Sequence, residues 1–176
     1  MKFFHNKKAL AFSLIELIVS IFVIALLAVL VTMAYERLSG MAGRAKCTSN
    51  LRKLHSAFEA HLQDVGYWPP QPEFAHDDRE GYETWWIERM KPYDVNPDDW
   101  LCPTIKKEAA AAKPEDRLRM HYIPTRFDAQ RRTPHRWPKM PWIIEIGNAH
   151  GRGPLMLMHD GAVVEMSDIV PDFYTD

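Results

Sequence analysis

The chain has 176 residues and a formal net charge of −1 at pH 7, with 22 Lys and Arg against 23 Asp and Glu. This balance gives no general reason to expect nucleic acid, or a strongly basic or acidic protein, as a partner. Apolar residues crowd the start of the chain, whereas Pro, Trp, Asp, Arg and His fill the rest. Residues 66–176, about 110 residues, then remain for a globular head, which is the size of one small folded domain.

The first predicted element is a membrane-spanning helix. Residues 17–34 carry no formal charge, and about 20 apolar residues are enough to cross a bilayer as a helix. Residues 1–10 contain Lys2, Lys7 and Lys8 and no acidic residue, so the positive-inside rule places the N-terminus in the cytoplasm and the chain after Ala34 on the opposite side. A secretory signal peptide is the alternative, but its apolar region is shorter and ends at a small-residue cleavage site.

Glu16 is an unexpected charge near the start of this apolar segment. In one interpretation the carboxylate reaches the headgroups or is protonated, at a cost below the roughly 2.5–3.5 kcal/mol of a central charge. In the other, a cut between Ala11 and Phe12 creates an α-amine four residues before Glu16, and this ammonium pairs with the Glu16 of a neighbouring subunit. Such a pair at about 4 Å is worth on the order of 4 kcal/mol gross at an effective dielectric of 20. That energy would be available only on assembly.

The sequence around this cut resembles the class III signal of type IV pilins and type II secretion pseudopilins: Lys7, Lys8, a small residue and then "FSLIELIVSIFVIALLAVL". The resemblance implies cleavage between Ala11 and Phe12 by a prepilin peptidase and N-methylation of Phe12. It also implies that Glu16 is the fifth residue of the mature chain. Ala11 departs from the Gly that the family usually has before the cut.

An amphipathic helix is predicted to continue the membrane helix through residues 35–65, because apolar residues recur there at three- and four-residue steps. Gly40 and Gly43 weaken it and predict a bend or an unwound turn, and Gly66 followed by Pro predicts its end. The expected core residues are Leu51, Leu54, Phe58 and Leu62, and the expected solvated residues are Arg52, Lys53, His55 and His61. The segment also resembles pseudopilins, in which a Leu-Arg/Lys-x-Leu helix runs into an Asp-x-Gly-x-Tyr-x-Pro exit.

Residues 94–105 contain part of a calcium-loop pattern. Asp94, Asn96 and Asp98 have the 1, 3, 5 spacing of such a loop. However, Asp99 replaces the glycine of its sixth position, and Ile105 replaces the glutamate of its twelfth. We therefore expect turns and a helix cap here rather than bound calcium.

The rest of the middle predicts short elements. Residues 81–92 indicate a short helix, and an Ala-rich helix is expected before Pro114. A strand centred on residues 121–123 is limited by Pro124 to an edge or an end. Residues 125–141 combine Arg with aromatic side chains, a composition that can hold phosphates and bases. Because they match no nucleic-acid motif, we expect a solvated loop and no nucleic-acid partner.

The C-terminal part predicts β-structure. Apolar runs at residues 142–146, 155–158 and 162–166 indicate strands, and Asp160-Gly161 indicates a hairpin with a type I′ turn. The predicted fold is α+β, with a long N-terminal helix packed on a small antiparallel sheet. Its parts are a leader (1–11), a transmembrane helix (12–34), an amphipathic helix (35–65) and a head (66–176).

A second resemblance concerns His150, which is followed after nine residues by Asp160-Gly161. This spacing is similar to the His-x9-Asp-Gly element of many pilin-like proteins from planctomycete- and verrucomicrobia-type bacteria, which also tend to have a Cys before Ser-Asn-Leu-Arg and a later Cys-Pro. Cys47 and Cys102 stand at those two places. In an oxidising periplasm they either pair or remain as two separate thiols.

The sequence contains no pattern that we assign to catalysis. It has no Gly-x-Ser-x-Gly, no phosphate-binding glycine loop and no His-Glu-x-x-His. His150, His159 and Asp160 offer acid-base or metal-binding groups, but we expect them to form turns and loops. We therefore predict no catalytic residue, no metal and no cofactor.

Together these features predict a structural subunit of a type II secretion pseudopilus in the bacterial inner membrane, with a periplasmic head. The resemblance implies self-association with other pseudopilins, and a prepilin peptidase, an assembly ATPase and an inner-membrane platform as partners. A type IV or DNA-uptake pilin is the alternative within the family. A membrane-anchored enzyme or ligand-binding domain is the alternative outside it.

Overall fold

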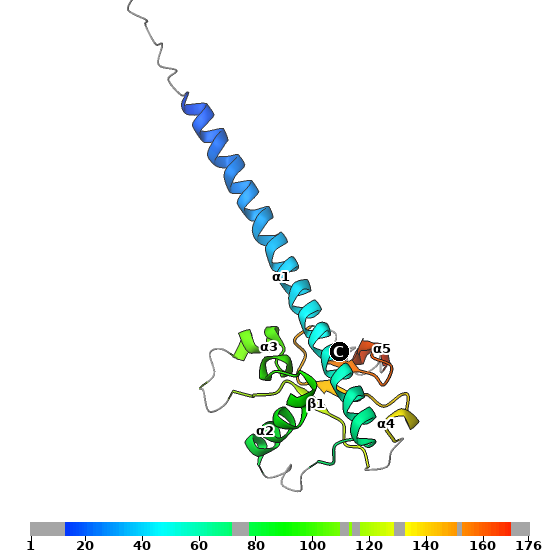
Figure 1. Cartoon of the computed structure of the whole chain (residues 1–176). Helices are drawn as coiled ribbons and strands as arrows, with labels where there is room; N and C mark the ends of the chain where they lie inside the picture. The colour runs from blue at the N-terminus through cyan, green and yellow to red at the C-terminus, as the bar shows by residue number, and fades with distance from the viewer. Residues whose placement is uncertain are drawn as a thin grey trace, which may run out of the picture. The chain divides into compact units, whose positions relative to one another are not determined.

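The computed structural model describes residues 13–71, 78–109, 113, 117–128, 133–150 and 153–169 (Figure 1). The chain forms two compact units, residues 1–39 and 40–176. The predicted leader and cleavage site, including Ala11 and Phe12, lie outside the described residues.

The first element is helix α1, Leu14–Val65. Ser13 directly precedes it, and its backbone N–H donates to Glu16 Oε2 at 2.9 Å, the Ser-x-x-Glu pattern of a helix start. The two polar side chains of the apolar segment bond to backbone carbonyls within the helix: Ser20 Oγ donates to Glu16 O at 2.6 Å, and Thr32 Oγ1 donates to Val29 O at 2.8 Å. These hydroxyls therefore need no water.

Helix α1 continues through Gly40 and Gly43, so the prediction of an unwound turn there is wrong. A glycine is needed at position 43 for a different reason, because a Cβ there would lie 2.7 Å from Thr104 Oγ1. The glycine allows helix α3, Pro103–Glu108, to approach α1 closely. The predicted helix end is confirmed, since α1 stops at Val65.

The predicted core face of α1 is confirmed for Leu51, Leu54 and Phe58, which are fully buried. His61 was expected to be solvated, and this is wrong, because its residue surface is only 1% exposed. Tyr93, from the 3-10 helix η2 (Lys91–Tyr93), lies against it with its hydroxyl 3.2 Å from His61 Nδ1.

Helix α2, Arg79–Met90, confirms the predicted helix at residues 81–92. Asp78 caps its start by accepting from Gly81 N at 2.9 Å. The turn-and-cap prediction at residues 94–105 is confirmed at the 3-10 helix η3, Pro97–Trp100. There the side chains of Asn96 and Asp99 form a reciprocal capping box.

A four-stranded antiparallel sheet follows in the order β1-β2-β3-β4. The strands are β1 (Tyr122–Pro124), β2 (Ile143–Glu145), β3 (Leu155–Leu157) and β4 (Val163–Glu165). Pro124 ends β1 at the edge of the sheet, as predicted. Residues 125–141 are not wholly a loop, because they include the short helix α4, Thr133–Arg136. The helix α5, Met166–Ile169, follows β4.

The β3–β4 hairpin is present, but its turn is not type I′. Of the two residues Asp160 and Gly161, only Gly161 has a positive φ (80°), whereas type I′ requires positive φ at both central residues. Gly161 N donates to Met158 O at 3.1 Å, and Met158 N donates to Ala162 O at 2.8 Å. This is the three-residue loop in which a turn is followed by one left-handed residue.

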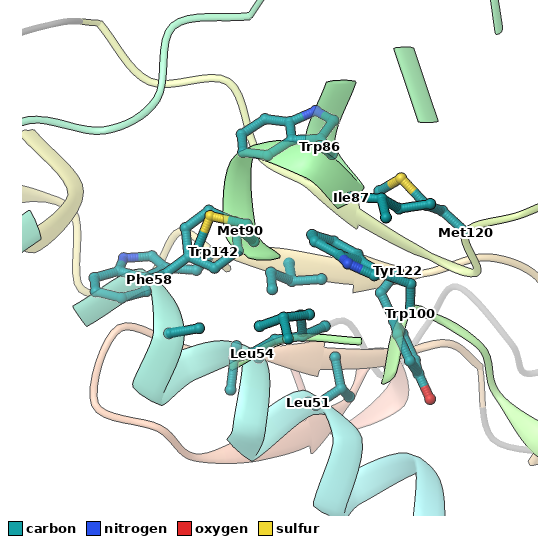
Figure 2. Packing of buried hydrophobic residues seen from close by; sticks show 14 of the residues in the cluster. Leu51, Leu54, Phe58, Trp86, Ile87, Met90, Trp100, Met120, Tyr122 and Trp142 are labelled. Atoms are coloured by element: carbon teal, nitrogen blue, oxygen red, sulfur yellow. The ribbon is translucent and has the colours of Figure 1, made fainter. Parts of the chain in front are cut away.

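Aromatic side chains fill the core where α1, α2 and the sheet meet (Figure 2). Phe58 stacks on Trp68 with ring centroids 4.5 Å apart and also contacts Trp86 and Trp100. Trp142, just before β2, packs edge-on against Trp68. The fold is α+β with a long N-terminal helix and a small antiparallel sheet, as predicted, and it is consistent with a pilin-like fold.

Candidate functional site

The apolar part of α1 is the first candidate. Its large side chains from Leu14 to Met33 are 45–75% exposed, and exposed apolar surface of this extent marks a membrane or protein interaction site. The helix is long and apolar enough to cross a membrane. As a helix, it satisfies its backbone hydrogen bonds internally, as the hydrocarbon requires.

Glu16 carries the one charge on this surface between Ser13 and Ala34. Its carboxylate accepts from the Ser13 amide, the peptide group that directly follows Phe12. The carboxylate is therefore turned toward the beginning of the helix, where negative charge also complements the helix dipole. This capping role was not predicted, although the Ser-x-x-Glu pattern signals it.

The second candidate is a buried cluster. A disulfide joins Cys47 of α1 to Cys102, just before α3, with the Cα atoms 5.2 Å apart. His150 lies beside it, with Nε2 3.6 Å from Cys102 Sγ. Glu145, the last residue of β2, completes the group, since its Oε1 is 3.4 Å from His150 Nε2.

Burial dominates the electrostatics of this cluster. Burial raises the pKa of the Glu145 carboxyl, while the nearby His150 and the Leu155 amide act in the opposite direction. Leu155 N donates to Glu145 Oε2 at 3.2 Å. Burial and the Glu145 charge also raise the pKa of Tyr122, the residue paired with Glu145 across the β1–β2 ladder.

The backbone around the cluster is held by His121. Cys102 N donates to His121 Nδ1 at 3.0 Å, and Ile146 N donates to His121 O at 2.8 Å. The residues before α3 and those at the end of β2 are thereby joined through one side chain and its backbone. Burial lowers the pKa of His121 and so favours the neutral ring that accepts this bond.

Asp160 and Gly161, predicted with His150 as one element, make their contacts elsewhere. Asp160 Oδ1 accepts from Ala162 N at 3.0 Å. At the same hairpin, His159 O lies 3.0 Å from His55 Nε2 of α1. A Cβ on Gly161 would lie 3.2 Å from His55 Nδ1. Asp160 and Gly161 thus form part of the β3–β4 hairpin, which contacts α1 at His55.

The structure therefore brings together Cys47, Cys102 and His150 and adds Glu145, which was not among the predicted site residues. The sequence does carry a signal for Glu145, because it is the one acidic residue inside the apolar run of residues 142–146. Alternation along a short strand places it on the same face as Ile143, and both are buried.

A pocket of about 430 Å³ lies next to His121, and its lining includes Leu118 and the cations Lys106, Arg117 and Arg119. Lys106 Nζ lies 3.2 Å from Asp98 Oδ1, and Arg119 Nη1 donates to Thr84 Oγ1 at 2.7 Å. Because these two cations already have partners, the pocket is a weaker candidate for an anionic ligand than the buried cluster is for a metal. Of the Arg residues in the segment 125–141, Arg131 and Arg132 lie outside the described residues.

Comparison of the chain with protein-family models, with curated proteins and with solved structures finds no match.

Proposed function

We propose that the chain is a filament subunit of the pseudopilin type, which assembles through α1 after cleavage between Ala11 and Phe12. The single observation that carries the proposal is the lone carboxylate of Glu16 on an otherwise apolar, exposed helix surface. In a simple anchor the Glu16 side chain caps the helix start, which a neutral Gln could also do, but its charge adds a free-energy cost of insertion. A filament gains an ion pair wherever a neighbour supplies an ammonium.

The position of the Glu16 side chain supports this proposal. It bonds to the amide of Ser13, one residue after the proposed new N-terminus. An α-amine at Phe12 on an adjoining subunit would meet a carboxylate already directed to that end of the helix. The resulting contact would fix the axial register of neighbouring subunits.

The proposed location is the inner membrane, with residues 1–11 in the cytoplasm and residues 66–176 in the periplasm. The proposed partners are other pseudopilins, a prepilin peptidase, an assembly ATPase and an inner-membrane platform. Among filament classes we favour a secretion pseudopilus, because the exit from α1 resembles that of pseudopilins. A type IV or DNA-uptake pilus is the alternative host.

The decisive experiment begins with mass spectrometry of the protein from cells that contain an active prepilin peptidase. We expect a chain that begins at N-methylated Phe12. A chain that begins at Met1 in those cells contradicts the proposal.

Variants then test assembly. Glu16→Gln keeps an oxygen that can accept from Ser13 but removes the charge, whereas Ser20→Ala removes only a hydroxyl bonded to Glu16 O. We expect Glu16→Gln to insert and be cleaved but to yield no filaments by electron microscopy, and Ser20→Ala to assemble as the parent chain does. Filament assembly by Glu16→Gln at the level of the parent chain would contradict the proposed role of the Glu16 charge. A parent chain that inserts but forms no filaments would support a plain anchor, as in a membrane-bound enzyme or binding domain.

A further inference from the structure

The buried cluster of Cys47, Cys102, Glu145 and His150 offers four donor atoms that all lie within 4.8 Å of one another. The donors come from four separate places in the chain: α1, the residue before α3, the end of β2 and the segment after β2. Both cysteines are fully buried, and the side chains of His150 and Glu145 are 3% and 0% exposed. A pilin-type assembly role makes no use of this group.

One donor atom of the cluster has no hydrogen bond. Glu145 Oε1 is buried and accepts none within the part of the chain that the structure describes, although His150 Nε2 lies 3.4 Å away. A buried carboxylate oxygen without a hydrogen bond is costly, and such oxygens usually pair with a cation or coordinate a metal. This oxygen faces the same imidazole that contacts Cys102 Sγ.

We propose that these four residues form a Zn²⁺ site in the dithiol state of the chain. Two thiolates, one imidazole and one carboxylate make up a four-coordinate set that tetrahedral zinc accepts. A tetrahedron with metal–ligand bonds of 2.0–2.3 Å places its donor atoms about 3.3–3.8 Å apart. The distances from His150 Nε2 to Glu145 Oε1 and to Cys102 Sγ, 3.4 and 3.6 Å, fit this requirement.

The donor set also selects the metal. Thiolates favour zinc over calcium and magnesium, which prefer oxygen ligands. The surrounding bonds hold the ligands in place, since Leu155 N donates to the second oxygen of Glu145 and Cys102 N donates to His121. Such outer bonds orient metal ligands in established sites.

Zinc and the disulfide exclude each other. Binding to the dithiol forms two Zn–S bonds and releases the two thiol protons, and no electron is transferred. Disulfide formation instead removes two electrons and two protons, which pass to a disulfide-bearing oxidant, such as those of the periplasm, that leaves as a dithiol. Because cysteine enters a new chain as the thiol, the metal can bind before oxidation takes place.

The test uses the full chain in detergent, with Co²⁺ as the spectroscopic probe. A phosphine reductant converts the disulfide to two thiols and becomes a phosphine oxide, and water supplies the oxygen and the two protons. After reduction we expect one Co²⁺ per chain, with thiolate charge-transfer bands and the visible spectrum of a tetrahedral site, and displacement by one equivalent of Zn²⁺. Before reduction we expect no binding.

Ligand variants make the test specific. In His150→Ala and Glu145→Gln we expect affinity to fall by at least the roughly 10- to 100-fold that loss of an outer-shell partner costs. His135→Ala removes an exposed imidazole and is expected to leave binding unchanged. Absence of Co²⁺ binding after reduction, or equal binding in all three variants, would overturn the proposal.

The rate of cysteine alkylation in the unaltered chain provides a second test that does not depend on whether the variants fold. In the reduced chain, one equivalent of Zn²⁺ should slow alkylation of Cys47 and Cys102 by at least tenfold, and an equal amount of Mg²⁺ should not. Equal alkylation rates with and without Zn²⁺ would also overturn the proposal. Neither readout depends on prepilin peptidase or on Glu16, so this result and that for filament assembly can be told apart.

Discussion

Gly161 combines two constraints at one residue. Its φ of 80° disfavours any side chain, and a Cβ would also lie 3.2 Å from His55 Nδ1. Gly147 has a similar φ of 79° but open space around its Cα. Gly147→Ala introduces only backbone strain, which costs about 1–3 kcal/mol. We expect Gly161→Ala to lower the free energy of unfolding by more than this, because it adds the contact with His55.

Urea denaturation of the two glycine variants in detergent measures this difference. Because His55 has contacts of its own, the contribution of the close contact is measured in the His55→Ala background, where Gly161→Ala should lower the free energy of unfolding by less than it does in the parent chain. If Gly147→Ala and Gly161→Ala are equally destabilised, the contact with His55 contributes nothing.

His61 predicts a dependence of stability on pH. Burial, followed by the charge of Arg89, lowers its pKa in the folded chain. The unfolded chain, in which His titrates near pH 6.5, therefore binds this proton more readily. The free energy of unfolding should be at its full value above about pH 6.5 and should fall as the pH drops below it.

Denaturation at pH 7 and pH 5 tests the role of His61. We expect His61→Gln to lose less stability than the parent chain between these two pH values. His135→Gln, at an exposed position, should follow the parent chain. Parallel behaviour of all three proteins would show that His61 does not titrate on unfolding.

At the scale of elements, an ion pair joins α1 to β4. Arg44 Nη2 lies 2.7 Å from Glu165 Oε1, and the Glu165 side chain is fully buried. Removal of one partner from a buried polar group costs about 1–3 kcal/mol. We expect Arg44→Met to lower the free energy of unfolding by about this amount, whereas Arg52→Met, on an exposed part of the same helix, should change it by less than about 0.5 kcal/mol. Equal effects in thermal denaturation would contradict the role of the pair.

The elements that could be predicted from sequence are those with a local signal. The apolar run and the three- and four-residue spacing predicted α1, and Asp160-Gly161 predicted the β3–β4 hairpin. The turn type was wrong because the signal does not distinguish a two-residue loop from a three-residue loop with one left-handed glycine. Gly43 was read as a weak point of α1, although it is a point of close contact with Thr104.

The site was less predictable because its parts are distant in the chain. Cys47, Cys102, Glu145 and His150 meet only once α1, the residues before α3 and β2 have packed together. No spacing rule covers such distances. The burial of His61 was missed for the same reason, since Tyr93 covers it from another element.

At the scale of the whole molecule, the disulfide closes a loop with a sequence separation of 55 residues. A loop of this size stabilises a fold by about 4 kcal/mol in the chain-entropy model. We expect Cys47→Ser combined with Cys102→Ser to lower the free energy of unfolding by about this amount in denaturation of the metal-free protein. A change below about 1 kcal/mol would show that packing alone holds the two segments together.

The same bond also determines what a pulling force can extend. When the chain is pulled from its two ends, the force is transmitted from Cys47 to Cys102 through the disulfide. The residues between the two cysteines therefore bear no force and are not extended, even after the surrounding structure has unfolded. At about 3.5 Å per residue, the 55-residue separation corresponds to roughly 190 Å of contour length that the disulfide excludes from the extension. A subunit stretched in an optical trap should therefore lengthen by that much more after reduction, so the oxidised protein is the shorter and stiffer tether.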